Sequence, residues 1–514
     1  GNVYRTGFMG AGKTTVGRLL AQELNRRFVD MDDLLEAEFG RPIHQGFAQE
    51  GEDFFRANEE ALLKRLARRC RLVVATGGGL PQKDQNRDLM RNSGQIVCLA
   101  AGFDSCLARI RGQGSALRPL WQDEESVRWL FEKRKKFYAD CHLSVPVDGQ
   151  SAQEAARQIA ARLLPETRFT VGLDGLDCPV VCTPSAPQAL ENLIGERRTA
   201  LLTDRRVARL HLDRYLTRLK DPLVVAVSGG ERIKTLASAG RICQKLLDNR
   251  FHRDDLLIAL GGGAVTDLGA FVAATYMRGM DFVLASTSLL GCVDAALGGK
   301  AAVNLGRAKN VVGCFSSPLG VVLDVAALKT LSRRRISEGL VEAYKTGLIA
   351  RPKLAQLIED QRRALLAKDL PLLSQVASRS AQAKAEIVSQ DFREAGPRRV
   401  LNLGHTFGHA VESWHRYRVS HGQAVGLGLV VAARLSRARG LISPGLTRRI
   451  ISTVGLIAGR PIPAPPAAEA WELMQSDKKI RRGRLVFVLL EDIGQPLIVD
   501  DVSPEELAEA LKGL

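Results

Sequence analysis

A glycine-rich segment near the start of the chain has the residues needed to bind a nucleotide phosphate. Gly7, Gly12, Lys13 and Thr14 fit the pattern GxxxxGK[ST], between a short strand-like run and a helical pattern, which is the context that the pattern requires. Backbone amides in such a loop, together with the N-terminus of the following helix, point at negative charge. We expect Lys13 to reach the β- and γ-phosphates and Thr14 to ligate Mg²⁺.

Carboxylates and further glycines follow at positions that suit phosphoryl transfer. Asp30 and Asp32 stand at alternate positions after the second strand pattern, so one can organise Mg²⁺ while the other accepts a proton from a substrate hydroxyl. Seen alone, this pair would as often be a solvated acidic turn. Gly77–Gly79 end a hydrophobic strand and permit close approach of a small polar ligand. Arg118 lies in a Gly- and Arg-rich stretch that we interpret as a lid.

A second group of chemically capable residues lies in the last third of the chain. Four of the eight histidines fall between positions 405 and 421, and His405 and His409 share one helix face. Glu342 and Lys345 interrupt an otherwise apolar helical pattern. Two or three histidines and a glutamate form a plausible Zn²⁺ set with room for substrate. Spacing alone favours His405 and His409 as joint ligands, although any single histidine is more often a core residue.

A glycine-rich turn between the two groups suits a dinucleotide. Gly261–Gly263 end a buried strand pattern in LLIALGGGAVTDLG, but GxGxxG is absent. From this stretch, a cofactor site and a simple tight turn are equally acceptable interpretations.

The elements that must position these residues predict an α/β architecture. Apolar, β-branched runs alternate with helical patterns, and strands are expected at 72–75, 96–99, 200–203, 223–227, 256–260 and 321–323. A helical pattern at 152–164 is broken by Pro165, and helical patterns dominate after about residue 328. We expect a P-loop domain with a parallel sheet and helices on both sides at 1–165, an α/β domain at 166–328 and a mainly helical domain at 329–514.

Composition narrows the functional classes. The 514 residues exceed one ordinary domain, and 45% hydrophobic with 25% charged residues is typical of a globular protein. The net charge of +17 fits either nucleic-acid binding or a field that attracts anionic metabolites. We favour the second, because aromatic residues are only 5% and no nucleic-acid motif is present.

The remaining patterns favour a cytoplasmic protein. No apolar run is long enough for a membrane span, and no leader pattern is present. The nine cysteines form no CxxC pair, which argues against disulfides and a thiolate zinc site.

About residues 1–165 resemble shikimate kinase. The resemblance rests on GFMGAGKTT, FVDMDDLLE, GEDFFRANE, VVATGGG, RPL and an arginine four residues before Tyr138. It implies ATP contacts at Gly7, Gly10, Ala11, Gly12, Lys13, Thr14, Thr15 and Arg118. It implies shikimate contacts at Asp32, Arg56, Gly77, Gly78, Gly79 and Arg134. Lys13, Asp32 and Arg118 would then be catalytic, and Asp30 would meet Mg²⁺ through water.

Residues from about 168 to the end are similar to 3-dehydroquinate synthase. The matching pieces are SGGERIKT, ALGGGAVTDLGAFVAATYMRG, STSLLGCVDAALGGKAAVNLGRAKNVVG, SEGLVEAYKTGLI, RVLNLGHTFGHA and SHGQAVG. The resemblance implies Zn²⁺ (or Co²⁺) held by Glu342, His405 and His421. It implies NAD contacts at Asp204, Glu231, Lys234, Gly262, Gly263, Asp267, Thr287, Ser288, Asp294, Lys300, Lys309 and Thr330. The implied substrate contacts are Arg278, Asn310, Lys345, Lys384, Arg398, Asn402, His409 and Lys479, and the implied catalytic residues of this part are Lys345, Lys300, Arg278, Asp294, Asn402 and His409.

The second resemblance also implies a reaction cycle within one site. NAD⁺ would oxidise the C5 hydroxyl of 3-deoxy-D-arabino-heptulosonate 7-phosphate, with Zn²⁺ polarising that oxygen. Phosphate would leave by elimination, the hydride would return, and ring opening with aldol closure would give 3-dehydroquinate. Gln423 stands where the family usually has Glu. We expect the lost charge to alter hydrogen bonding around His421 and metal affinity.

Two alternatives stay open. One is a P-loop kinase fused to a metal-dependent polyol dehydrogenase. The argument against it is that the basic residues of this part favour an anionic substrate; these are Lys300, Lys345, Lys384 and Arg398. The other is a basic nucleic-acid-binding or scaffold protein with decayed sites. The favoured interpretation predicts small-molecule substrates, no nucleic-acid or membrane partner, and a homodimer formed through the second part.

Overall fold

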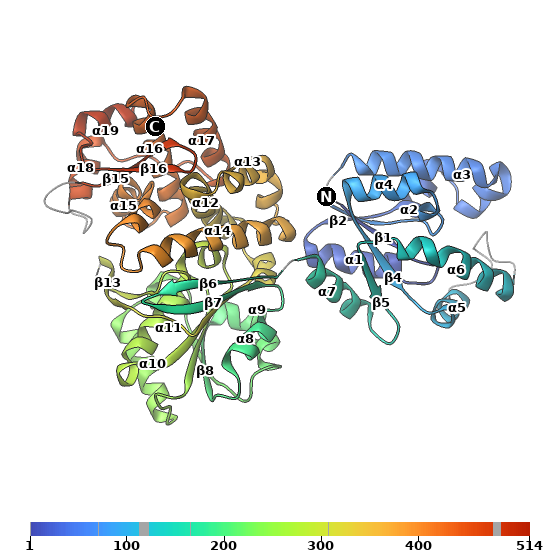
Figure 1. Ribbon diagram of the computed structural model, residues 1–514, viewed down its shortest axis with the longest axis horizontal. Helices are drawn as coiled ribbons and strands as arrows, with labels where there is room; N and C mark the ends of the chain where they lie inside the picture. Colours follow the sequence, from blue (N-terminus) through green and yellow to red (C-terminus); the bar gives the residue numbers. More distant parts are fainter. Residues whose placement is uncertain (1, 70, 113–122, 165, 307, 476–484) are drawn as a thin grey trace. The chain divides into compact units, whose positions relative to one another are not determined.

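The computed structural model describes residues 2–69, 71–112, 123–164, 166–306, 308–475 and 485–514. The chain divides into two compact units, residues 1–164 and 165–514 (Figure 1). None of the described helices is both long and apolar enough to cross a bilayer.

The first unit is built on a five-stranded parallel sheet in the order β2-β3-β1-β4-β5. Its strands are β1 (Asn2–Thr6), β2 (Arg27–Asp30), β3 (Leu72–Ala75), β4 (Gly94–Ala100) and β5 (Leu143–Pro146). Every residue of β1 and β3 is buried, because helices cover both faces of the sheet. The predicted parallel sheet is therefore confirmed.

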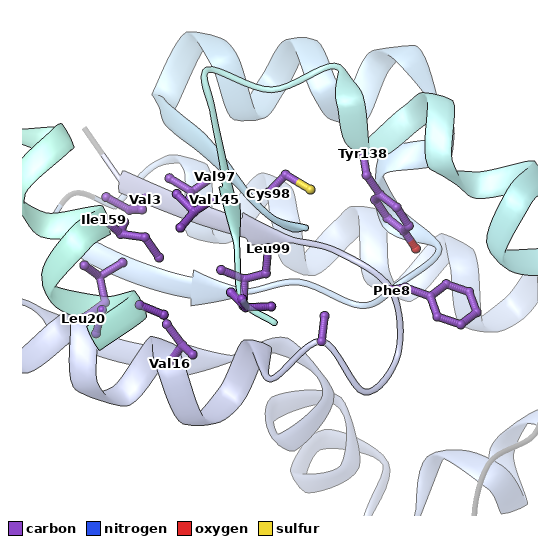
Figure 2. Close-up of a cluster of buried hydrophobic side chains, with 14 of the residues drawn as sticks. Val3, Phe8, Val16, Leu20, Val97, Cys98, Leu99, Tyr138, Val145 and Ile159 are labelled. Carbon is purple, nitrogen blue, oxygen red and sulfur yellow. The ribbon is translucent and has the colours of Figure 1, made fainter. Parts of the chain in front are cut away.

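Two apolar clusters attach helices to the two faces of this sheet. On one face, Val16 and Leu20 of α1 (Lys13–Leu24) and Ile159 of α7 (Ala152–Leu163) join one buried cluster with Val3 and Val97 (Figure 2). The other cluster joins β-strand side chains to α2 (Met31–Phe39), α3 (Ile43–Ala67) and α4 (Asp84–Ser93). The unit also contains α5 (Phe103–Gly112) and α6 (Glu124–Ala139).

The second unit begins with a seven-stranded sheet in the order β6-β7-β14-β11-β10-β8-β9. The strands are β6 (Thr167–Leu173), β7 (Leu176–Thr183), β8 (Thr199–Asp204), β9 (Leu223–Val227), β10 (Leu256–Gly261), β11 (Asp281–Ser286) and β14 (Gly320–Asp324). Only the β6–β7 pair is antiparallel within this described sheet. The chain order reverses between β8 and β10, and ligands bind beyond the carboxyl ends of the strands at such a point.

Helices α8 (Ala186–Ile194), α9 (Arg205–Leu216), α10 (Leu236–Asp248) and α11 (Gly263–Thr275) accompany this sheet. All six strands predicted from the sequence are present, and β3 and β9 have the predicted bounds. A hairpin of β12 (Lys300–Leu305) and β13 (Ala308–Phe315) follows.

The rest of the second unit is mainly helical, as expected. Its helices are α12 (Arg333–Ala350), α13 (Pro352–Leu366), α14 (Leu370–Gln390), α15 (His405–Trp414), α16 (His421–Ala438), α17 (Pro444–Ile457), α18 (Ala467–Gln475) and α19 (Pro504–Leu511). Every residue from Ile336 to Ile349 in α12 is buried, so polar side chains on this helix face other protein groups. The hairpin of β15 (Phe487–Asp492) and β16 (Gln495–Val499) was not predicted.

Candidate functional sites

The first candidate site is a phosphate-binding loop between β1 and α1. Gly10 and Gly12 have φ angles of 77° and 86°, which residues with a side chain rarely adopt. A Cβ atom at Gly10 would also lie 2.6 Å from the carbonyl oxygen of Cys106. The loop therefore requires glycine for both conformation and space, and it ends at the N-terminus of α1.

Lys13, Thr14 and Asp30 converge on a cavity of about 410 Å³ at this loop. Lys13 Nζ donates to the carbonyl oxygens of Gly7 at 3.0 Å and Phe8 at 3.1 Å, and Thr14 Oγ1 donates to Asp30 Oδ2 at 2.7 Å. A hydroxyl and a carboxylate at this separation fit Mg²⁺, a cation that prefers oxygen ligands. The predicted Gly10, Ala11, Gly12 and Thr15 also line the cavity.

Asp32 lies in the same cavity, next to Asp30. Its backbone amide donates to Asp30 Oδ1 at 3.1 Å, so Asp30 caps the start of α2. Burial, followed by the negative charge of Asp30, raises the pKa of Asp32 to about 6. A carboxylate with a raised pKa can take a proton from a hydroxyl near neutral pH.

The triple glycine after β3 forms a cradle for charged side chains. A Cβ atom at Gly77 would collide with Glu59, and one at Gly79 would collide with Arg56. At Gly78 it would lie 3.5 Å from Nη1 of Arg134, which is buried. The structure thus brings all three glycines together with both predicted arginines, and Arg118 lies outside the described residues.

Two further residues of this site escaped the sequence analysis. Glu59 is 1% exposed, pairs with Arg56 Nη1 at 2.6 Å and has a pKa raised to about 7, mainly by burial. The sequence feature that could have identified Glu59 is its spacing of three residues from Arg56 in a helical pattern, which places the two side chains next to each other. Arg109 of α5 lines the cavity at the phosphate-binding loop and donates to the carbonyl oxygen of Gly10 at 3.2 Å. No feature of the surrounding sequence distinguished it from neighbouring arginines.

The second unit gathers its predicted nicotinamide residues at the carboxyl edge of the large sheet. Asp204 ends β8 and caps α9, while Gly262 and Gly263 follow β10 at the start of α11. Thr287 and Ser288 follow β11, and a Cβ atom at Gly262 would lie 3.2 Å from Ser288 Oγ. These residues therefore flank the point of strand-order reversal, where a cofactor is expected.

A charged network extends this edge towards the β12–β13 hairpin. Lys234 is 3% exposed, and its Nζ lies 2.7 Å from Asp267 Oδ2 and 2.5 Å from Asn310 Oδ1. Glu231 Oε1 accepts from Asn304 at 3.0 Å. Asn310, predicted as a substrate residue, thus contacts the predicted nicotinamide residue Lys234. Thr330 Oγ1 lies 2.9 Å from His211 Nε2, and no described contact joins Thr330 to the others.

Glu342, His405 and His421 form a candidate metal site. One ligand atom from each lies within 4.8 Å of the others, and Glu342 Oε1 is 3.6 Å from His405 Nε2 and 3.3 Å from His421 Nε2. Glu342 is 1% exposed, yet neither of its carboxylate oxygens receives a well-oriented hydrogen bond. A buried carboxylate needs a cationic partner, and Lys345 pairs with Oε2. Oε1 and the two histidine nitrogens are then a donor set that fits a divalent cation.

The structure selects between the histidine pairs that spacing left open. His421 joins His405 in the cluster, and their ring centroids are 5.4 Å apart. His409 is not part of the donor set, although its ring centroid lies 5.6 Å from that of His405. His415 faces the carbonyl oxygen of Pro463 at 3.0 Å. The joint ligation by His405 and His409 that spacing favoured has no support from this geometry.

Buried cations surround the candidate metal site. Lys345 Nζ lies 2.6 Å from Glu342 Oε2, and Lys384 Nζ donates to Asp294 Oδ1 at 2.5 Å. Burial lowers the pKa of Lys345, but Glu342 and Asp294 outweigh it and the net shift is upward. Burial lowers the pKa of Lys384 despite Asp294. Arg398 is buried and donates to the carbonyl oxygen of Gly298 at 3.0 Å.

Glu394, which the sequence analysis missed, connects two predicted residues of this group. It pairs with Lys300 and accepts from Asn402 Nδ2 at 2.8 Å. The sequence feature that could have identified Glu394 is its position between Lys384 and Arg398, two residues that were predicted to bind substrate. Arg278 is exposed with a φ of 65°, and the described contacts do not join it to this group. Lys479 lies outside the described residues.

The hydrogen bonds of Gln423 do not involve the His421 ring, whose hydrogen bonding we expected this position to alter. Its Oε1 accepts from the backbone amide and hydroxyl of Ser420, and its Nε2 donates to the carbonyl oxygen of Arg460. This is a capping box at the start of α16. The side chain therefore stabilises the helix start, and its hydrogen-bonding groups are engaged away from His421.

Comparison with known proteins identifies both units. Residues 9–164 match the family model of shikimate kinase, residues 224–338 that of the N-terminal part of 3-dehydroquinate synthase, and residues 339–480 that of its C-terminal part. A bifunctional shikimate kinase/3-dehydroquinate synthase of Thermotoga maritima is 32% identical over 517 residues, which cover 99% of each chain. The chain belongs to this bifunctional family.

Further relatives resemble the synthase domain of this shikimate kinase/3-dehydroquinate synthase fusion. A 3-dehydroquinate synthase of Halorhodospira halophila is 41% identical over 325 residues, 62% of this chain and 91% of that protein. The solved structure of ValA, a 2-epi-5-epi-valiolone synthase from Streptomyces hygroscopicus with NAD⁺ and Zn²⁺ bound, is 25% identical with a TM-score of 0.62. That likeness covers 66% of this chain and 97% of that one. The family match overturns the alternative of a polyol dehydrogenase.

Proposed function

We propose that the first unit phosphorylates shikimate with ATP and that the second converts 3-deoxy-D-arabino-heptulosonate 7-phosphate to 3-dehydroquinate. For the kinase, the supporting observation is the convergence of Lys13, Thr14 and Asp30 on one cavity. For the synthase, it is the buried Glu342, His405 and His421 cluster among lysine and arginine side chains.

In the kinase, each side chain has a distinct role in positioning charge. Lys13 would exchange the carbonyl oxygens of Gly7 and Phe8 for phosphate oxygens of ATP. Thr14, and Asp30 through water, would hold Mg²⁺, which would neutralise charge on the phosphates. Arg56 and Arg134 bind the shikimate carboxylate, because guanidinium groups pair well with carboxylates. Asp32 accepts the hydroxyl proton as the oxygen attacks the γ-phosphorus and the bond to the β,γ-bridging oxygen breaks, which releases ADP.

In the synthase, Glu342, His405 and His421 would hold a divalent cation, and NAD would lie along the edge formed by Asp204, Gly262 and Thr287. When bound, these groups supply Lewis-acid polarisation of a substrate oxygen and a hydride acceptor.

The chain's own side chains bind and orient the anionic substrate of the synthase. Lys384 and Arg398 offer buried positive charge to phosphate or carboxylate, and Glu394 holds Lys300 and Asn402 in place. Lys345, kept charged by Glu342 and Asp294, offers a further cation. Burial of Lys345, Lys384 and Arg398 away from bulk water strengthens their interactions with the substrate.

Several further predictions accompany this proposal. The domain boundaries at 165/166 and 328/329, a homodimer formed through the synthase part and a cytoplasmic location remain predictions. So does the absence of nucleic-acid and membrane partners. Arg118 and Lys479 keep their predicted roles in phosphoryl transfer and substrate binding.

Paired assays on one purified preparation test the proposal. One assay measures ATP-dependent phosphorylation of shikimate, and the other measures phosphate release from the heptulosonate in the presence of NAD. We expect both activities, and we expect a metal chelator that is removed before the kinase assay to abolish only the second. A preparation that is folded and metal-loaded but inactive in either assay would contradict the corresponding half.

Glu59→Gln is expected to raise the KM for shikimate about tenfold while changing kcat less than about threefold. Above pH 7, where Glu59 is mostly ionised, the substitution removes the charged partner of Arg56 inside the cradle, and such charge-assisted hydrogen bonds are stronger than neutral ones. Steady-state kinetics with saturating ATP measure the effect. Glu52→Gln is a matched control, because Glu52 also pairs with Arg56 but is 54% exposed and exposed pairs contribute little. Equal effects of the two substitutions would contradict this role of Glu59.

Gln423→Glu is expected to leave the Zn²⁺ affinity of the synthase within about twofold of that of the parent protein. A glutamate keeps the capping box with Ser420, and its charge is favourable at a helix N-terminus. Competition with a chromophoric chelator measures the affinity. A tenfold change in either direction would restore the expectation that position 423 tunes the metal site.

A further inference from the structure

Helix α15 carries three functional groups on a single stripe. His405, His409 and Glu412 are spaced at i, i+4 and i+7, so they lie on one face of the helix. The Glu412 side chain is 6% exposed although it is a carboxylate, and charged groups are seldom buried without a partner. The proposed metal site uses His405 from this stripe but assigns nothing to Glu412.

Glu412 lies directly behind the proposed metal ligand His421. Its Oε2 is 3.5 Å from His421 Nδ1, while His421 Nε2 lies 3.3 Å from Glu342 Oε1. The imidazole ring is therefore held between two carboxylates, with Nε2 facing the proposed metal position. The other oxygen of Glu412, Oε1, accepts from Lys309 Nζ at 3.0 Å, which orients the carboxylate from the opposite side.

His421 needs such a partner because of its place in the fold. It is the first residue of α16, preceded by the N-cap Ser420, so no earlier helical turn restricts its side chain. A histidine that ligates through Nε2 must carry its proton on Nδ1, and an acceptor at Nδ1 fixes both the tautomer and the ring orientation. His405 has an equivalent arrangement, since its Nδ1 lies 3.3 Å from the carbonyl oxygen of Leu403.

We propose that Glu412 is a positioning residue of the synthase, which orients His421 for metal binding by accepting a hydrogen bond from its Nδ1. The proposal rests on the metal site assigned above. Lys309 of β13 supports Glu412, so the carboxylate links the hairpin, which carries predicted nicotinamide residues, to the metal site. Gln423, two residues after His421 in the sequence, has no part in this role.

Metal titration of the apoprotein tests the proposal. Glu412→Leu removes both charge and acceptor, whereas Glu412→Gln removes the charge but keeps an acceptor oxygen. We expect Glu412→Leu to weaken Zn²⁺ binding about 10- to 100-fold, the range found for partners of metal-bound histidines, and Glu412→Gln to have a smaller effect. The visible absorption spectrum of the Co²⁺-substituted protein is expected to change with Glu412→Leu, because the ligand geometry relaxes.

Glu359→Gln is the matched control. Glu359 is another buried carboxylate of the same unit, bonded to Tyr344 and Arg449 and distant from the metal ligands in the described contacts. We expect it to lower the melting temperature without changing the Zn²⁺ affinity or the Co²⁺ spectrum. If circular dichroism shows that Glu412→Leu does not fold, the Zn²⁺ affinity and the Co²⁺ spectrum of Glu412→Gln decide the question.

The outcomes separate this inference from the proposed function. Failure of the parent protein to bind one Zn²⁺ per chain would overturn the metal site itself. Tight Zn²⁺ binding by the parent protein, together with unchanged affinity and Co²⁺ spectrum in the folded Glu412 variants, would overturn only the positioning role.

Discussion

Lys13→Ala is expected to lower the kinase kcat about 10³-fold or more while leaving synthase activity unchanged. Lys13 Nζ lies over the phosphate loop, bonded to carbonyl oxygens of Gly7 and Phe8. It is the described side chain best placed to neutralise charge on the transferring phosphoryl group. Loss of one preorganised donor of this kind costs about 10²–10³-fold in an acyl-transfer enzyme, and a full positive charge on a phosphate is worth more. Steady-state rates of both reactions measure the effect.

Lys13→Ala is expected to affect the kinase activity alone, and this difference between the two activities tests whether the sites are independent. The substitution leaves two carbonyl oxygens facing an open cavity, where water can replace the lost donor, so we expect little change in thermal stability. Lys64→Ala, which removes an exposed lysine of α3 in the same unit, should keep both activities. Loss of synthase activity in folded Lys13→Ala protein would show that the two sites are not independent.

His405→Ala is expected to abolish synthase activity, by about 10³-fold or more, and to leave the kinase intact. His405 contributes one of three clustered donors, and two remaining donors cannot hold Zn²⁺ in the coordination that catalytic sites use. Metal content after dialysis is expected to fall from one ion per chain to a small fraction. Elemental analysis and the two activity assays check this outcome on the same sample.

His415→Ala provides the control for His405→Ala. It removes another histidine of the same segment, whose ring faces the carbonyl oxygen of Pro463 and lies outside the donor set. We expect it to retain bound metal and both activities. If His415→Ala lost the metal and His405→Ala kept it, the assignment of the ligand set would be wrong.

The phosphate loop shows how much a short contiguous segment can predict. Gly10, Gly12 and Lys13 are neighbours in the chain, and the loop conformation, the helix N-terminus and the lysine all depend on local geometry. For the same reason the strand at 72–75 matched its predicted bounds, since its continuous apolar run reflects burial on both faces of a sheet. The strand at 223–227 also matched, although it is an edge strand that is only partly buried.

The metal site shows where local patterns fail. Helical spacing places His405 and His409 on one face, and nothing in that segment distinguishes a ligand from its neighbour. The family resemblance supplied His421 as an expectation. The structure brings His421 to His405 because α15 and α16 pack together. It places Glu342 of the buried helix α12, which the sequence had already indicated, beside both histidines.

Amino-acid order alone therefore specifies the phosphate loop, the alternating strands and helices, and the residue types of both sites, because each depends on interactions within a few positions. The Glu59–Arg56 pair lies within one helix, whereas the pairing of Glu394 with Lys300 and of Glu412 with His421 arises only when separate elements pack. A carboxylate acquires its role from the cation or imidazole that folding places beside it, and in the last two pairs that partner belongs to another element of the fold.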